Sequence, residues 1–374
     1  MNNRTYLLYA NPETNSDILY ASGFIAPDPF VLISKNGEKY LILRDLEIGR
    51  AKTQSRVKKI LSFSKIAESL GNNGNRVISI EDVAVSALMR LNIKNIEVPF
   101  NFPVGMADAL RESGIELITK PDPFFPERII KSRYEIDAIA EAQRKNEIAM
   151  EAAASALRNT VIKRSIPYYK DEKLTSERLR EIINTELMRN NLIASHTIVS
   201  CGIQSINPHE EGHGPIYSDK PIIIDIYPRD MGSMYYGDMT RTFIIGKPSD
   251  QLKHQYSAVY EAQSAALEMI KDGVTFSSVH KKVNAVFAKH GFSTGEKNGK
   301  IQGFFHSTGH GIGLDLHEPP RIYSLPGIFK KGMIVSVEPG LYYPKTGGVR
   351  IEDLVVVEKY GIRNLNKFHK NYIP

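Results

Sequence analysis

The chain is short of the features that mark secreted and membrane-spanning proteins. Its 374 residues include one cysteine, Cys201, which excludes an intramolecular disulfide and a metal site built from several thiolates. The N-terminal segment has only a four-residue apolar patch, shorter than the centre of a signal peptide. No apolar run approaches the roughly 18 residues of a membrane span. We therefore expect a cytoplasmic protein with no membrane partner.

The chain also lacks a large excess of positive or negative charge. Lysine and arginine total 48 against 42 acidic residues, a formal net charge of +6, far from the concentrated basic charge of nucleic-acid-binding proteins. A basic run at Arg50–Lys59 has no interleaved aromatic residues, so a solvated helix face explains it. We expect no nucleic-acid partner.

The length and the strand and helix patterns predict two domains. Residues 1–125 alternate β-type runs with helical spacing, which is typical of a small α/β domain. The segment 120–126 holds three prolines and is the predicted linker. Residues 126–374 form the second predicted domain. It starts with a long helix over 132–158 and a second helix over 173–190, capped by Thr175 or Ser176.

The other expected elements follow from local patterns. In the first domain we predict strands over 17–24, 30–43 (a hairpin turning at Asn36-Gly37), 77–80 and 95–98, and helices over 56–70, 84–91 and 105–113. In the second we predict strands over 197–201, 221–227, 234–245, 333–338 and 349–357, and helices over 253–271 and 277–290.

Histidine is concentrated in one glycine-rich stretch. His306, His310 and His317 lie within twelve residues, although the chain has ten histidines in all. Glycine lets a ligand or a second strand approach closely, and histidine is the commonest metal ligand and proton carrier near neutral pH. The stretch is therefore predicted to border an active site.

Four acids lie inside apolar strands, where an ionised group is costly unless it is paired or metal-bound. They are Asp225, Asp238, Glu338 and Glu352. The first two are 13 residues apart and the last two 14 apart, and each pair brackets a turn-rich segment. Each pair is thus predicted to lie on neighbouring strands of a hairpin, and two facing hairpins would gather four carboxylates with pseudo-two-fold symmetry.

Alternation along the strands sorts neighbouring side chains. Arg350 and Glu352 share one face while Asp353 points away, and Arg241 points away from Asp238. An ion pair of Asp353 with Arg241 or Arg350 explains that acid, but such pairs do not explain four further acids beside a histidine cluster. Four carboxylates and an imidazole suit two divalent cations, Mn²⁺ or Co²⁺, with Zn²⁺ also possible.

These motifs resemble those of the creatinase/aminopeptidase P/prolidase family, the metallopeptidases of pita-bread fold related to methionine aminopeptidase. The resemblance covers residues 127–360 and includes Asp238-x-Thr-Arg-Thr, His306-x-x-Gly-His310, His317-Glu318, Glu338-Pro-Gly and Arg350-x-Glu352-Asp353. It implies an α+β protein in which a smaller N-terminal α/β domain precedes a pita-bread catalytic domain of antiparallel strands with flanking helices. It also implies a homodimer.

The resemblance assigns roles residue by residue. It gives the metal ligands as Asp225, Asp238, His310, Glu338 and Glu352. Glu338 would also act as general base and acid. His317 and His209 would contact the substrate on either side of the scissile bond, with His213 as a rival for the second position, and His306 would be a further active-site histidine. Arg350 would orient Glu352 from behind the metals.

The implied activity is hydrolysis of the bond before proline. We expect an Xaa-Pro aminopeptidase acting on longer peptides, with an Xaa-Pro dipeptidase acting on dipeptides as the alternative. A creatinase-like hydrolase and a non-catalytic pita-bread binding module are further alternatives. Both lack the full metal-ligand set in the relatives concerned, so the complete set of five here argues against them.

Overall fold

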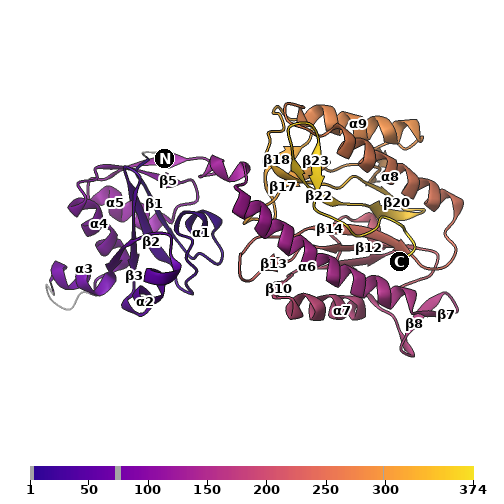
Figure 1. Ribbon diagram of the computed structural model, residues 1–374, viewed down its shortest axis with the longest axis horizontal. Helices are drawn as coiled ribbons and strands as arrows, with labels where there is room; N and C mark the ends of the chain where they lie inside the picture. The colour runs from indigo at the N-terminus through magenta and orange to yellow at the C-terminus, as the bar shows by residue number, and fades with distance from the viewer. Residues whose placement is uncertain (1–3, 72–76, 298) are drawn as a thin grey trace. The chain divides into compact units, whose positions relative to one another are not determined.

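The computed structural model describes residues 4–71, 77–297 and 299–374. The chain divides into two compact units, Met1–Pro126 and Glu127–Pro374, at the end of the proline-rich segment and one residue from the expected boundary (Figure 1). The second unit holds every predicted site residue. Within the described part of the chain, no helix has the length and apolar character needed to cross a membrane.

The first unit is a mixed sheet with helices on both faces. The sheet order is β4-β3-β2-β1-β5-β6, and separate apolar cores lie on its two faces. Its strands are β1 Tyr6–Ala10, β2 Phe30–Lys35, β3 Glu38–Leu43, β4 Lys59–Ser62, β5 Asn95–Pro99 and β6 Glu116–Lys120. Its helices are α1 Ser16–Ser22, α2 Asp45–Gln54, α3 Phe63–Leu70, α4 Ile80–Arg90 and α5 Val104–Glu112.

Three predictions for this unit are wrong. The run at 17–24 is helix α1, which starts where Asn15 accepts a bond from the Ile18 N–H. The region 56–70 is not one helix, because Lys59–Ser62 pairs with β3 as a parallel strand before Ser62 caps α3. Residues 77–80 form no strand, since Ser79 and Asp82 make the capping box of α4.

In its described residues, the second unit has four long helices and several short strands. Its helices are α6 Arg133–Arg158, α7 Ser176–Arg189, α8 Asp250–Met269 and α9 Phe276–Lys289, with short 3₁₀ turns η1 Pro126–Ile129 (at the unit boundary) and η2 Gln204–Ile206. Its main strands are β11 Ile198–Cys201, β12 Pro221–Ile226, β14 Met239–Ile244, β17 Gly309–Gly311, β18 Glu318–Ile322, β19 Ile334–Val337, β22 Asp353–Val357 and β23 Ile362–Asn364. Shorter strands are β7 Val161–Lys163, β8 Ile166–Tyr169, β9 Glu172–Lys173, β10 Leu192–Ile193, β13 Arg229–Asp230, β15 Gly295–Lys297, β16 Lys300–Gln302, β20 Gly340–Tyr343 and β21 Gly347–Arg350.

The helices and strands of this unit form two similar halves. In one half, α6 and α7 pack on the sheet β11-β12-β14; in the other, α8 and α9 pack on the sheet β18-β17-β19-β22-β23. Figure 1 shows the two helix pairs on opposite sides of the strands. Each half buries its own apolar core, so the strand edges that meet between them are left to carry polar side chains.

One predicted strand begins later than expected and another is interrupted, and this shapes the site. The run 234–245 forms a strand only from Met239. The run 349–357 breaks into β21 and β22 around Ile351 and Glu352. Asp238 and Glu352 therefore lie just outside regular strands, where their side chains are free of strict alternation.

A buried ion cluster fixes the loop between β17 and β18. The Glu318 carboxylate binds Arg128 at 2.5 Å and Lys131 at 2.8 Å, and all three side chains are less than 10% exposed. Glu318 also accepts the Asp315 N–H, and an added Cβ at Gly313 would lie 2.6 Å from its Oε1. These contacts fix the conformation of the loop that carries His317.

We predict that Glu318→Gln lowers the free energy of unfolding at pH 7 by roughly 3–5 kcal/mol, because the buried Lys131 and Arg128 lose the carboxylate that they share, although Arg128 keeps its ion pair with Asp315. Burial alone would raise the pKa of Glu318, but Lys131 and Arg128 outweigh it and hold the pKa below its ordinary value. The contribution of a carboxylate with a depressed pKa is present above the unfolded pKa and is lost as pH falls through the folded one.

Urea denaturation from pH 7 down to pH 3 checks this prediction. The gap between wild type and Glu318→Gln should narrow as the pH falls. The control is Asp137→Asn, which removes the partner of the exposed Arg133 and should cost no more than about 1 kcal/mol. Equal losses in the two variants would contradict the prediction.

Candidate active site

The four strand acids come from two hairpins, as the spacing predicted. Strand β12 pairs antiparallel with β14, with Asp225 opposite Thr240, and Asp238 lies just before β14. Strand β19 pairs antiparallel with β22, with Val337 as the last residue paired. Glu338 directly follows Val337, and Glu352 directly precedes Asp353, the partner of Val337 in that last pair. Each hairpin therefore presents two carboxylates at one end.

The two hairpins meet through Glu352. Its N–H donates to the Thr240 carbonyl at 3.1 Å, and its Oε2 accepts from the Thr240 hydroxyl at 2.7 Å. Two residues further along β14, the Thr242 hydroxyl donates to the Arg350 carbonyl at 2.8 Å. These bonds join the two hairpins at the junction of the halves.

His310 enters the junction from β17. Its N–H donates to the Ser336 hydroxyl, and its Nδ1 lies 3.0 Å from the Gly311 carbonyl. The ring is thereby turned so that Nε2 lies 3.6 Å from Asp238 Oδ2 and 3.5 Å from Glu338 Oε1. Gly309 permits this approach, because a Cβ there would lie 1.9 Å from the Ser336 carbonyl oxygen.

This set of atoms fits metal ions. Ligand atoms of Asp238, His310 and Glu352 all lie within 4.8 Å of one another. Asp225 Oδ1 and Glu352 Oε1 are buried with no hydrogen-bond partner among the described residues. A buried carboxylate oxygen without a donor is costly unless a cation takes the donor's place. Hard oxygen ligands with one imidazole suit divalent ions.

The electrostatics show the same need for positive charge. Burial, followed by repulsion from the other acids, raises the pKa of Asp238 and of Glu352 well above the ordinary range. Burial likewise raises the pKa of Glu338 to about 7 and lowers that of His310 to about 3. The enclosed site thus disfavours the charged forms of these four side chains, and divalent cations would stabilise the carboxylates.

Arg350 contacts a different acid from the one expected. Its guanidinium binds Asp225 Oδ2 at 2.7 Å, and it reaches Glu352 only through the Thr240 hydroxyl, which accepts from Arg350 Nε at 3.2 Å. The guanidinium reaches from the end of β21 to β12, while the Thr240 hydroxyl lies between Arg350 and the Glu352 carboxylate. It also donates to the Pro208 carbonyl at 3.3 Å, which anchors the loop that carries His209.

His306 lies one step back from the acids. Its Nε2 is 3.0 Å from the Tyr342 hydroxyl, which accepts from Arg350, and its Nδ1 is 2.8 Å from the Ser307 carbonyl. Burial, with a further contribution from Arg350, lowers its pKa to about 3. Both ring nitrogens are engaged, so the structure places His306 as a neutral wall residue. Sequence analysis had not identified Tyr342.

One pocket of about 690 Å³ brings the predicted residues together. Its lining includes the residues predicted from sequence, namely Asp225, Asp238, His310, Glu338, Glu352, His317, His306, His209 and Arg350. The His317 ring packs edge-on against His310 with centroids 4.4 Å apart. His213 does not line the pocket; its side chain is 75% exposed beside Glu210. The geometry thus separates the two loop histidines.

Arg321 is a pocket residue that sequence analysis missed. It lies in β18 opposite His310 in β17 and lines the pocket. Its guanidinium makes no hydrogen bond or ion pair with any other residue that the structure describes. Burial and then the Arg321 charge lower the pKa of His317, which places that charge near the substrate space. In the sequence, Arg321 directly follows the Pro319-Pro320 pair.

Similar proteins match both the sequence and the fold. The sequence model of metallopeptidase family M24 matches residues 137–359. An Xaa-Pro dipeptidase of Pyrococcus furiosus is 30% identical over 370 residues, covering 96% of this chain and 92% of that protein. An Xaa-Pro dipeptidase of Pyrococcus horikoshii is 32% identical over 288 residues, 75% of each protein.

Solved structures agree on the fold. The X-Pro aminopeptidase from Thermotoga maritima superposes with a TM-score of 0.82 at 23% identity, covering 98% of this chain and 96% of that one. Prolidase from Pyrococcus furiosus gives 0.77 at 25% identity with the same coverage. The predicted fold class, α+β with a pita-bread domain, is confirmed. The chain belongs to metallopeptidase family M24, the creatinase/aminopeptidase P/prolidase group, and is a metal-dependent hydrolase.

Proposed function

We propose that this protein is an Xaa-Pro dipeptidase that works with two divalent cations. The observation that carries the proposal is Arg321, a pocket cation with no protein partner among the described residues. A dipeptide ends in a carboxylate one residue beyond the scissile bond, and an arginine near His317 suits that group. The names of the two Pyrococcus relatives support dipeptides over the longer peptides expected first.

The metal ligands proposed are the five from sequence. Asp225, Asp238 and Glu352 would hold one ion, and Asp238, His310, Glu338 and Glu352 the other, with Asp238 and Glu352 shared. Mn²⁺ or Co²⁺ fits this oxygen-rich set, and Zn²⁺ is possible. Bound there, the ions would lower the pKa of water toward roughly 7 and polarise the scissile carbonyl.

The chain's own residues supply the proton transfers and the orientation. Glu338 would take the proton of the attacking water and deliver it to the leaving nitrogen. That nitrogen is tertiary in an Xaa-Pro bond, so it needs the proton in order to leave. His317 would stabilise the developing oxyanion from β18's side and His209 would bind the substrate from the opposite loop. The cytoplasmic location and the homodimer remain predictions from the sequence.

A substrate panel tests the proposal. With added Mn²⁺ or Co²⁺, the protein should hydrolyse Ala-Pro, with much slower hydrolysis of Ala-Pro-Ala and of Ala-Ala. A chelator should abolish the activity, and Mn²⁺ should restore it. Glu338→Gln and His310→Ala should each lose at least about 100-fold in kcat, as loss of a general base or a ligand predicts. Full activity in both variants would refute the site.

Arg321 provides the test of dipeptide selection. Arg321→Ala should raise KM for Ala-Pro by about 10- to 100-fold, the value of a charged hydrogen bond of roughly 1.5–3 kcal/mol. Ala-Pro-amide has no carboxylate, so its hydrolysis should change less than about threefold. Arg321→Lys should recover part of the dipeptide activity. Equal losses on the two substrates would mean that Arg321 does not bind the carboxylate.

The two loop histidines form a matched pair. His209→Asn should lower kcat/KM for Ala-Pro by about 10- to 1,000-fold, because an interaction with the reacting substrate is lost. His213→Asn, only four residues away and outside the pocket, should leave kcat/KM within about twofold of wild type. The reverse pattern would assign the role to His213.

A further inference from the structure

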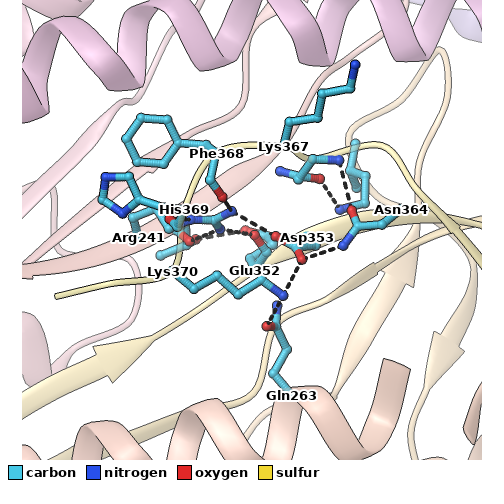
Figure 2. Close-up of polar contacts among 12 residues, drawn as sticks. Arg241, Gln263, Glu352, Asp353, Asn364, Lys367, Phe368, His369 and Lys370 are labelled. Carbon is cyan, nitrogen blue, oxygen red and sulfur yellow. Dashed lines mark hydrogen bonds and ion pairs between the residues drawn. The ribbon is translucent and has the colours of Figure 1, made fainter. Parts of the chain in front are cut away.

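Arg241 lies on the far side of Glu352 from the pocket and is fully buried. Its five N–H groups all donate: NH1 to the Glu352 and Thr240 carbonyls at 2.5 and 2.9 Å, NH2 to Asp353 Oδ1 at 2.9 Å and the Phe368 carbonyl at 3.0 Å, and Nε to the His369 carbonyl at 2.9 Å. Figure 2 shows this fan of bonds between β14, the Glu352–Asp353 segment and the C-terminal segment. A guanidinium has no further donors, so its position is fully determined.

Glu352 depends on this arrangement because it lies in the gap between β21 and β22. Its N–H donates to Thr240, its carbonyl accepts from Arg241, and its carboxylate accepts from Thr240. Two consecutive residues of β14 thus bind the backbone and the side chain of Glu352. Asp238, the other proposed shared ligand, lies two residues earlier in the same chain segment.

We propose that Arg241 is a positioning residue of the metal centre, which sets the separation of Glu352 from Asp238 by holding the Glu352 carbonyl. The inference rests on the proposed metal site and adds a residue that contacts neither metal nor substrate. Arg241 holds Glu352 by its carbonyl oxygen, so the effect on the Glu352 carboxylate passes through the backbone.

Two substitutions around Asp353 separate an effect on the position of Glu352 from an effect on the stability of the protein. Asp353 has two cationic partners, Arg241 at 2.9 Å and Lys370 at 2.5 Å, and it also accepts from Asn364. Arg241→Met leaves Asp353 paired with Lys370, and Lys370→Met leaves it paired with Arg241. Each variant removes one cation from the same acid, but only Arg241→Met frees the Glu352 carbonyl.

The experiment titrates metal-stripped protein with Mn²⁺ alone and measures free Mn²⁺ by electron paramagnetic resonance, with thermal melts alongside. We expect wild type to bind two ions. Arg241→Met should lose about 10- to 100-fold in affinity for at least one ion, the usual effect of removing a residue that orients a ligand. Lys370→Met should stay within about twofold of wild type, whatever its melting temperature.

Arg241→Lys covers the case in which Arg241→Met does not fold. The lysine keeps a cation beside Asp353, so this variant should fold. Its single nitrogen cannot replace the five hydrogen bonds of Arg241, so it should bind Mn²⁺ more weakly than wild type. Wild-type affinity in Arg241→Lys, or an equal loss in Lys370→Met, would overturn the positioning role. Failure of wild type to bind Mn²⁺ would instead refute the proposed metal site itself.

Discussion

Mutual repulsion among buried carboxylates is the constraint on which the second unit depends. Asp225, Asp238, Glu338 and Glu352 converge on one junction, and burial and proximity raise the pKa of those for which a shift is resolved. Such a cluster is unfavourable for folding unless positive charge enters it. Arg350 supplies one positive charge, on Asp225. The remaining acids and the unpaired oxygens call for cations from solution.

The surrounding structure holds these acids in place from outside the pocket. Buried amides grip both hairpins: Gln143 of α6 accepts the Asp238 N–H at 2.8 Å, and Gln263 of α8 donates to the Val337 carbonyl at 3.1 Å. Arg241 and the C-terminal segment then fix Glu352 from behind. Because each half packs its own core, the junction can be polar without loss of apolar burial. Rigid positioning is what a metal centre requires of its scaffold.

The sequence predicted the gathering of the strand acids better than it predicted the elements of the first unit. Buried acids such as Asp225 stand out in apolar strands, and their spacing implied the two hairpins. Local patterns were weaker evidence, because helix α1 is a β-type run that a cap at Asn15 turns into a helix. Arg321 was missed because its importance depends on the pairing of β17 with β18, which no local pattern reveals. Arg350 pairs with Asp225 across 125 residues, a contact that strand alternation alone does not specify.

Anomalous diffraction from crystals grown with Mn²⁺ tests the central claim most directly. Data collected at the manganese absorption edge locate each ion without reference to activity. We expect two peaks enclosed by the side chains of Asp225, Asp238, His310, Glu338 and Glu352, and their loss in Glu352→Gln crystals. Peaks elsewhere, or no peaks in a pocket whose five side chains keep the arrangement described above, would contradict the assignment of this carboxylate cluster as a metal centre.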